Sequence, residues 1–304
     1  MRSRPAPPLW AVHGLLLLAA VLVATSFLVG EAVADQLDPA VLTLVRFVIA
    51  AGLFFPWLCW HQLLARPSAT DLARYAAISA ALVLFFWLMF LSLRFTTALN
   101  TGVIFTLTPG ISGLYSAVLL RERLGLHRLV ALVLATAGAL WVVLEGDPLR
   151  LARLDFNHGD LLFLLGCLAM AFYTPLVKLL YRGEHMATMT FWILVTGAAW
   201  LLLFAGFRLA AVPWPGVGWW VWGAVLYLAV FCTIITFFLT QYATLRLGPT
   251  RVMAYSFLYP PLVLLLAWGL GQPLPSWFTL AGMVLIVPAM FVIQAGAEPL
   301  PPPA

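Results

Sequence analysis

Ten apolar segments, separated by short polar connections, account for most of the 304-residue chain. A helix that crosses a bilayer needs roughly 20 apolar residues, and each segment approaches or exceeds that length. The pattern therefore predicts an all-α integral membrane protein with ten transmembrane helices. The expected spans are residues 8–30, 39–64, 72–93, 97–120, 127–145, 159–182, 187–207, 217–245, 250–270 and 275–294.

The ten segments divide into two halves of five, residues 1–150 and 151–296, followed by a Pro-rich tail at 297–304 that we expect to be disordered. The segments that start at Leu99 and at Arg251 match each other, and each carries a proline within its first helix, Pro109 or Pro260. Five crossings is an odd number, so the second half is predicted to be inverted relative to the first. Inverted repeats are typical of secondary transporters. Each proline should bend or loosen its helix.

Composition and charge support this prediction. The chain is 64% hydrophobic and 9% charged, which excludes a water-soluble domain. The basic residues are scattered at helix ends rather than gathered on one face, so nucleic-acid binding is not expected. They favour one side of the predicted membrane, which the positive-inside rule assigns to the cytoplasm together with both termini. That side holds Arg2, Arg4, Arg66, Arg74, Arg121, Arg123, Arg128, Lys178, Arg182, Arg246 and Arg251, against Arg94, Arg150, Arg153 and Arg208 on the other.

Signatures of catalysis and of metal or cofactor binding are absent from the sequence. It has no HExxH, no Walker loop, no GxSxG and no close carboxylate pair within a span. Cys59, Cys167 and Cys232 lie far apart in apolar runs and are expected to be small core residues. No enzyme activity and no cofactor are therefore predicted. Because no Asp or Glu lies near a predicted midplane, transport is not expected to need a proton gradient, with Glu31 as the one plausible exception.

Arg46 is the one charged residue deep within an apolar run. A charge inside the membrane is costly and usually faces a bundle interior or a cavity. One interpretation is that Arg46 contacts a carboxylate or phosphate of a substrate. The other is that it snorkels to the external face, or pairs with Glu31 or Asp35 in a structural role.

Polar and aromatic side chains within the spans are further candidates for contact with a substrate. In the fourth span, residues 101, 105, 108, 112 and 115 recur at helical spacing and would share one face. Such side chains equally serve helix packing and hydrogen bonds between helices. The candidate substrate-binding residues are Arg46, Phe86, Asn100, Thr101, Phe105, Thr108, Tyr173, Thr236, Gln241, Tyr255 and Tyr259.

The run TSFLVGEAVADQLDPAVLTLVRFVIAAGLFF, which starts at Thr25, resembles the first two helices of the EamA family in the drug/metabolite transporter superfamily. The run ALNTGVIFTLTPGISGLYSAVLLRERLGLHRLVALVLATAGAL, which starts at Ala98, is similar to that family's fourth and fifth helices, with Pro109, Glu122 and Gly138 at matching positions. The resemblance covers the whole chain. It implies a ten-helix transporter in which helices from both halves surround a central cavity.

This resemblance implies a secondary transporter that exports small metabolites, such as amino acids or related amphipathic compounds, by alternating access. The expected location is the inner membrane of a bacterium, and the expected partners are the lipid bilayer and a small-molecule substrate, with the protein acting as a monomer. Two alternatives are a membrane partner protein that transports nothing and an intramembrane enzyme. The enzyme would require His, Asp or Glu residues that converge at depth.

Overall fold

The computed structural model of this chain describes residues 8–121, 125–144, 147, 149 and 156–295, and within them every regular element is a helix. This agrees with the all-α prediction. In a bilayer, a helix satisfies all its backbone hydrogen bonds internally, which is why long apolar runs fold this way. The predicted disordered tail, residues 297–304, lies outside the described residues.

Eight helical segments of the described chain are long and apolar enough to cross a membrane. Two more helices, α6 (Leu126–Val143) and α14 (Trp277–Ala295), contain shorter apolar stretches. The chain is therefore a multi-pass membrane protein. The eight segments are α1 (Leu9–Val33), α2 (Pro39–Trp60), α3 (Ala69–Ser92), α4–η1–α5 (Ala98–Leu119), α8 (His158–Leu180), α9–η2 (Met186–Ala211), α10–η4–α11 (Trp219–Leu247) and α12–η5–α13 (Pro249–Gly269).

Polar residues in the connections start several of these helices. The carboxylate of Asp38 accepts from the backbone N–H groups of the first turn of α2, and Asn157 does the same for α8. Ser68 and Asp71 form a reciprocal capping box at the start of α3. These side chains satisfy donors that a helix leaves unpaired at its first turn. The short polar connections therefore fix where each apolar run becomes a helix.

Three of the long segments change helix type between two α-helical parts, and a fourth, α9–η2, ends in a 3-10 helix. A 3-10 turn, η1 (Phe105–Leu107), separates α4 from α5, which has Pro109 in its first turn. Another, η5 (Ala254–Leu258), separates α12 from α13, which has Pro260 in its first turn. This confirms that the two prolines loosen matching helices, because proline removes a backbone donor and clashes with the preceding turn. The third change, the π-helical η4 (Val230–Ile235), was not predicted.

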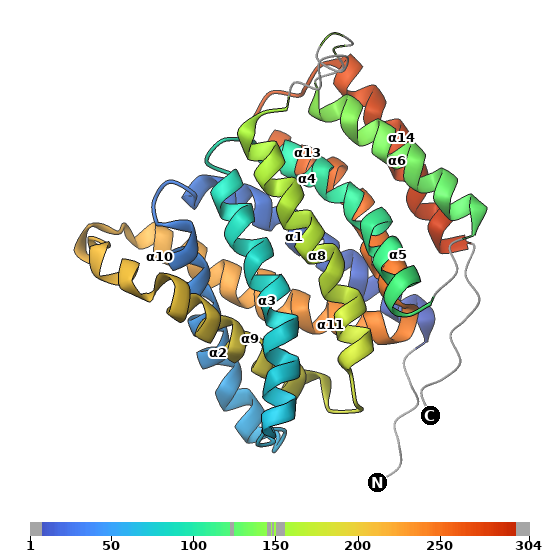
Figure 1. Ribbon diagram of the computed structural model, residues 1–304. Helices are drawn as coiled ribbons and strands as arrows, with labels where there is room; N and C mark the ends of the chain where they lie inside the picture. The colour runs from blue at the N-terminus through green and yellow to red at the C-terminus, as the bar shows by residue number, and fades with distance from the viewer. Residues whose placement is uncertain (1–7, 122–124, 145–146, 148, 150–155, 296–304) are drawn as a thin grey trace.

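The helices pack in a recurring set of pairs. The most extensive contacts join α3 to α8 and α6 to α14, and α2 packs on α9. Helix α1 contacts α11 and α13, while α8 contacts α3 and α5. Figure 1 shows α6 and α14 side by side at one edge of the molecule and α2, α9 and α10 at the opposite edge. The centre of the bundle is formed by α1, α3, α8 and the helices that contain the breaks.

Polar contacts tie the helices together at both ends of the bundle. At one end, Arg208 forms an ion pair with Asp38 at 2.9 Å, and Arg94 donates to the carbonyls of Ala34 and Leu37. At the other end, the hydroxyl of Thr188 donates to the carbonyl of Leu63. There, Arg74 also pairs with Asp71 and with Glu184. The contacts of Arg208 with Asp38, of Thr188 with Leu63 and of Arg74 with Glu184 join the first half to the second.

Helices α6 and α14 touch most closely at two glycines. A Cβ at Gly138 would lie 2.7 Å from the carbonyl oxygen of Gly282, and a Cβ at Gly282 would lie 2.8 Å from that of Gly138. Small residues at a crossing let two membrane helices approach within backbone contact, where dispersion replaces the missing hydrophobic drive. The pair at the edge therefore depends on these two positions.

Gly282→Ala is expected to destabilise the protein, because the new methyl group overlaps the Gly138 carbonyl and the side chain of Val142, 2.6 Å away. Overpacking of this kind costs about 1–3 kcal/mol. Thermal unfolding in detergent should show a lower midpoint. Gly223→Ala in α10 is the matched control, since nothing lies within 4 Å of its Cβ position. An unchanged midpoint for Gly282→Ala would show that this crossing is loose.

Candidate functional site

A cavity of ≈ 40 Å³ lies at the centre of the bundle, and seven of the fifteen residues that line it are aromatic. They come from both halves of the chain, on α1, α3, η1, α8, α11 and α13. Small polar groups, among them the hydroxyls of Ser26, Thr236 and Thr240 and the thiol of Cys232, interrupt this wall. The aromatic residues are Phe27, Phe85, Phe86, Phe105, Tyr173, Phe237 and Tyr259.

The rings around this cavity contact one another in a continuous cluster. The Phe105 and Tyr259 ring centroids are 5.2 Å apart, and Phe27 lies 6.0 Å from each of them. These tilted and edge-on arrangements are the ones aromatic pairs favour. Phe105 begins the 3-10 turn η1, and Tyr259 immediately follows η5. The two matching helix breaks therefore meet across the cavity through their aromatic residues.

The cavity is too small for a metabolite in this conformation. A space of ≈ 40 Å³ has room for only a few water molecules, since one water needs about 10–15 Å³ by the same measure. Drug-sized ligands occupy pockets of roughly 300–1,000 Å³. The described conformation is thus closed around its centre, and a larger guest requires the surrounding helices to part.

Arg46 is fully buried beside this cavity. Its Nε donates to the hydroxyl of Thr233 and its Nη2 donates to the carbonyl of Cys232, each at 2.5 Å. Its guanidinium carbon lies 4.2 Å from the centre of the Phe86 ring, a cation–π contact. Arg46 thereby joins α2 to the π-helical segment η4.

The second interpretation of Arg46, that it snorkels to the external face or pairs with Glu31 or Asp35, is wrong. Its side chain does not snorkel to a membrane face, because it is 0% exposed. It pairs with neither Glu31 nor Asp35, and the ion pair of Asp35 is with Arg94 at 3.8 Å. The guanidinium instead donates to Thr233 and Cys232 of η4, and the sequence around Arg46 does not predict this contact. These partners, which belong to the second half of the chain, satisfy two of the three guanidinium nitrogens and so make the burial of Arg46 possible.

Gln241 and Tyr173 form a buried polar link at the edge of the cavity. The amide of Gln241 donates to the hydroxyl of Tyr173 at 2.9 Å, and Thr190 donates to the amide oxygen of Gln241 at 2.6 Å. This chain of bonds joins α8, α9 and α11. A buried network that is fully satisfied rigidifies its surroundings. Gln241 therefore positions the Tyr173 ring in the wall.

The structure brings together most of the residues singled out from the sequence. Five line the cavity: Phe86, Phe105, Tyr173, Thr236 and Tyr259. Arg46 and Gln241 stand directly behind the wall, each in contact with a lining residue. The remaining four, which lie elsewhere, are Asn100, Thr101, Thr108 and Tyr255.

These four are placed by local structure. The Thr101 hydroxyl donates to the carbonyl of Ala98 within its own helix, and Asn100 sits half-buried at the helix start. The 3-10 turn η1 disrupts the regular stripe expected of the fourth span, so Thr108 follows the break and is buried away from the cavity.

Tyr255 belongs to a different contact. Its hydroxyl is hydrogen-bonded to Nδ1 of His13 near the start of α1. Tyr255 lies within η5, one turn before Tyr259, and a 3-10 turn does not place residues four apart on one face. The helical spacing that paired Tyr255 with Tyr259 in the sequence therefore failed at the helix break.

Other lining residues were missed because their sequence signal is weak. Phe27 and Phe85 read as ordinary apolar residues of a membrane helix, and Ser26 reads as a small packing residue. The buried cysteines Cys167 and Cys232 match the expectation of core positions, but Cys59 is exposed on α2 and does not. Periodicity cannot separate a face toward lipid from a face toward a core when both are apolar.

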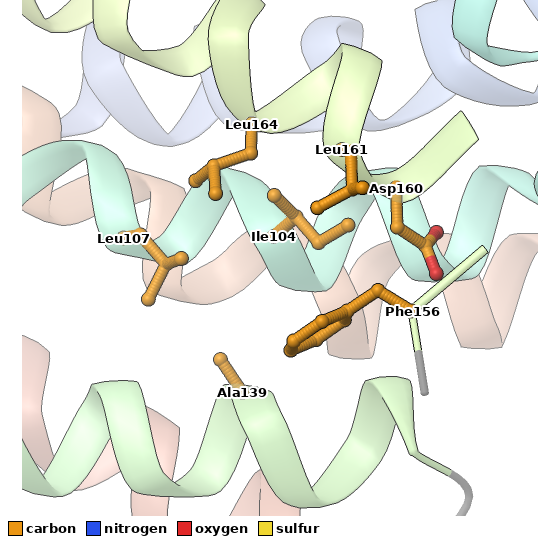
Figure 2. Close-up of a pocket in the computed structure, with 7 residues that line it drawn as sticks. All are labelled: Ile104, Leu107, Ala139, Phe156, Asp160, Leu161 and Leu164. Atoms are coloured by element: carbon orange, nitrogen blue, oxygen red, sulfur yellow. The ribbon is translucent and has the colours of Figure 1, made fainter. Parts of the chain in front are cut away.

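The other spaces lie away from the centre of the bundle, and most are apolar. One of ≈ 330 Å³, at the end of the bundle that holds Arg74 and Glu184, is lined mainly by charged and polar side chains. Figure 2 shows one of ≈ 60 Å³ where Ile104 and Leu107 of the fourth span and Phe156 lie opposite Ala139 of α6. Two larger grooves, of ≈ 510 and ≈ 490 Å³, flank α9 on the outside of the bundle and are lined mostly by aliphatic and aromatic side chains. None of these spaces lies next to both helix breaks, so the central cavity is the candidate site.

Comparison with known proteins gives a consistent result. The model of the EamA-like transporter family matches the chain twice, at residues 10–144 and 157–294. An uncharacterized transporter of Archaeoglobus fulgidus is 26% identical over 288 residues, which cover 93% of this chain and 97% of that protein. The uncharacterized transporter YcxC of Bacillus subtilis is 24% identical over 283 residues, covering 89% and 88% respectively.

A solved crystal structure shares the fold. It superposes with a TM-score of 0.70 and covers 93% of this chain and 96% of its own, at 19% sequence identity. At this identity the likeness concerns the arrangement of helices alone.

Proposed function

Because this chain belongs to the EamA-like transporter family, we propose that it is a secondary transporter of small amphipathic metabolites, such as amino acids or related compounds. The observation that carries the proposal is the closed aromatic cavity, whose wall is shared between the two halves and flanked by two matching helix breaks. Discontinuous helices around a central site are a feature of transporters that work by alternating access. A membrane partner protein that moves nothing would need no such cavity.

The proposed mechanism rests on two inverted five-helix repeats, the first within residues 1–150 and the second within 151–296. The pattern of helix contacts supports it. In these repeats α1 corresponds to α8, α2 to α9, α3 to α10–α11, α4–α5 to α12–α13, and α6 to α14. Under this correspondence the contact of α3 with α8 is equivalent to the contact of α10–α11 with α1, and the contact of α5 with α8 is equivalent to that of α13 with α1. The pairs α2–α9 and α6–α14 map onto themselves. Rocking one half against the other would open the cavity to one face and then to the opposite face.

We further propose ten crossings, with α6 and α14 as the fifth and tenth, and both termini in the cytoplasm of a bacterium whose inner membrane holds the protein as a monomer. The end ties support this topology: Arg208 and Asp38 lie at one end, and Arg74 and Glu184 at the other, as alternating connections require. The excess of basic residues at the second end supports a cytoplasmic location for that end. Export is proposed from family likeness alone.

The proposal is tested by a screen followed by flux. Purified protein is heated with a panel of amphipathic metabolites, and a compound that binds the folded state raises the unfolding midpoint. The compounds that do so are then offered to proteoliposomes that contain the protein. Saturable uptake that empty liposomes lack is the expected result. Binding without flux for every such compound would contradict the assignment as a transporter.

Flux is expected to persist when the pH gradient across the proteoliposome is collapsed. Within the described residues, no carboxylate lines the central cavity. Glu31 and Asp160 lie at helix ends, where Asp160 accepts a hydrogen bond from Thr96 at 2.6 Å. Glu31→Gln and Asp160→Asn should both retain gradient-independent flux. Loss of flux with the gradient, together with loss in either variant, would reveal a proton site at that residue.

A further inference from the structure

Arg46 carries a positive charge that its surroundings do not balance. Two of its nitrogens donate to neutral oxygens, on Thr233 and Cys232, and its third, Nη1, is buried with no hydrogen-bond partner. Among the residues that the structure describes, no carboxylate forms an ion pair with it. A guanidinium stays protonated in proteins, so the charge cannot be relieved by loss of a proton. A buried charge without a counter-ion is costly, and an anion placed at Nη1 would relieve that cost.

A single layer of side chains, which includes Phe86 and Cys232, separates this guanidinium from the cavity. Phe86 lines the cavity on one side and stacks on Arg46 on the other, and Cys232 lines the cavity while its carbonyl accepts from Arg46. A change of rotamer at Phe86 would bring the guanidinium to the cavity surface. The position of the Phe86 ring therefore determines whether Arg46 is accessible from the cavity.

The rest of the wall defines the other part of the guest. The rings of Phe27, Phe105 and Tyr259 offer aromatic faces and edges to a flat apolar body. No Asp or Glu of the described chain lies in the wall, so nothing there would receive an ammonium group. The site therefore offers one cation and an aromatic box, and it offers no anion.

We propose that the preferred substrate is an aromatic carboxylate without a cationic group, whose carboxylate accepts hydrogen bonds from Nη1 of Arg46 once Phe86 turns aside. This inference rests on the proposed transport function, and it narrows the substrate class from amphipathic metabolites in general to aryl carboxylates, with amino acids as weaker substrates. It ranks a simple aryl carboxylate above a zwitterionic aromatic amino acid, because the ammonium of the amino acid would lose its water without gaining a partner. Arg suits this role better than Lys because its planar fork keeps Nη1 free for a carboxylate while Nε and Nη2 stay bonded to Thr233 and Cys232.

The test measures binding to the purified full-length protein in detergent by isothermal titration calorimetry. The probes are phenylacetate, phenylalanine and phenethylamine, which share a benzyl group and differ in charge. Phenylacetate is expected to bind at least about tenfold more tightly than either of the others, a difference of about 1.4 kcal/mol. Arg46→Gln should weaken phenylacetate binding at least about tenfold, and Arg46→Lys should weaken it less. Arg208→Gln, which removes an arginine at the rim of the bundle, is the matched control and should bind as the unaltered protein does.

Three outcomes would overturn the inference: equal or tighter binding of phenylalanine or phenethylamine, binding of none of the probes, or unchanged phenylacetate binding by Arg46→Gln. The probe series in the unaltered protein decides the matter even where an Arg46 variant fails to fold. Failure here differs from failure of the transport proposal. A transporter with another substrate would still show saturable flux of a compound from the thermal screen, whereas a protein that is no transporter would show none.

Discussion

Arg46→Ala is expected to reduce transport about 100-fold or more while the protein still folds. The substitution removes two hydrogen bonds from a charged donor, to Thr233 and to Cys232, and each such bond contributes about 1.5–3 kcal/mol. Every 1.36 kcal/mol added to a barrier slows a step about tenfold. If the loss of the two bonds raises the barrier to the conformational change, the transport rate falls by more than two orders of magnitude. Initial uptake into proteoliposomes, per amount of monodisperse protein, measures the effect.

Arg46→Lys separates charge from geometry. A lysine retains the charge, but its single ammonium cannot reach the Cys232 carbonyl and the Thr233 hydroxyl in the way the planar guanidinium does. We expect it to recover transport only in part, to about a tenth of the original rate. Normal transport by both variants would show that the contact between α2 and η4 plays no part in the cycle. A variant that loses its thermal transition altogether would instead assign Arg46 to folding.

Pro109→Ala and Pro260→Ala are expected to slow transport about tenfold and to bias the resting conformation in opposite directions. Alanine restores a backbone donor, so each helix can run through its 3-10 turn and gain a hydrogen bond of about 0.5–1.5 kcal/mol. If the halves are inverted, straightening the fourth span favours one face and straightening the ninth favours the other. Accessibility of a cavity residue from each face, measured alongside flux, reports this bias.

The control for these prolines is Pro56, which lies within α2 on its exposed face. Pro56→Ala removes a helix proline without touching the cavity, so it should leave flux unchanged. The inverted mechanism would be contradicted if Pro109→Ala and Pro260→Ala shifted accessibility toward the same face.

The helices were predictable because lipid allows few alternatives. An apolar run in a bilayer must satisfy its own backbone, so its length and its polar ends locate the helix, as for α2 from Pro39 to Trp60. The breaks near Pro109 and Pro260 were predictable because proline cannot donate a backbone hydrogen bond. No residue of comparable effect marks η4, whose sequence VFCTII reads as continuous helix.

The candidate site was predictable where chemistry stands out and unpredictable where only packing decides. Arg46 and Tyr173 are conspicuous in an apolar sequence, and both are at the cavity. Phe27 is not, since a phenylalanine toward lipid and one toward a cavity look the same in sequence. Thr108 was misplaced because the expected stripe assumed one regular helix through residues 101–115, where the structure has a 3-10 turn. Helix type, more than residue type, set the limit of the sequence-based prediction.

The most direct test of alternating access uses the native thiol in the cavity wall. Cys232 is 3% exposed in the closed conformation, so a water-borne reagent reaches it only when the halves part. With Cys59→Ser and Cys167→Ser, Cys232 is the single cysteine left in the chain. We expect a membrane-impermeant methanethiosulfonate to label it from either face of oriented vesicles, and a transported compound to slow the labelling from both. Labelling from one face alone, or from neither, would contradict alternating access.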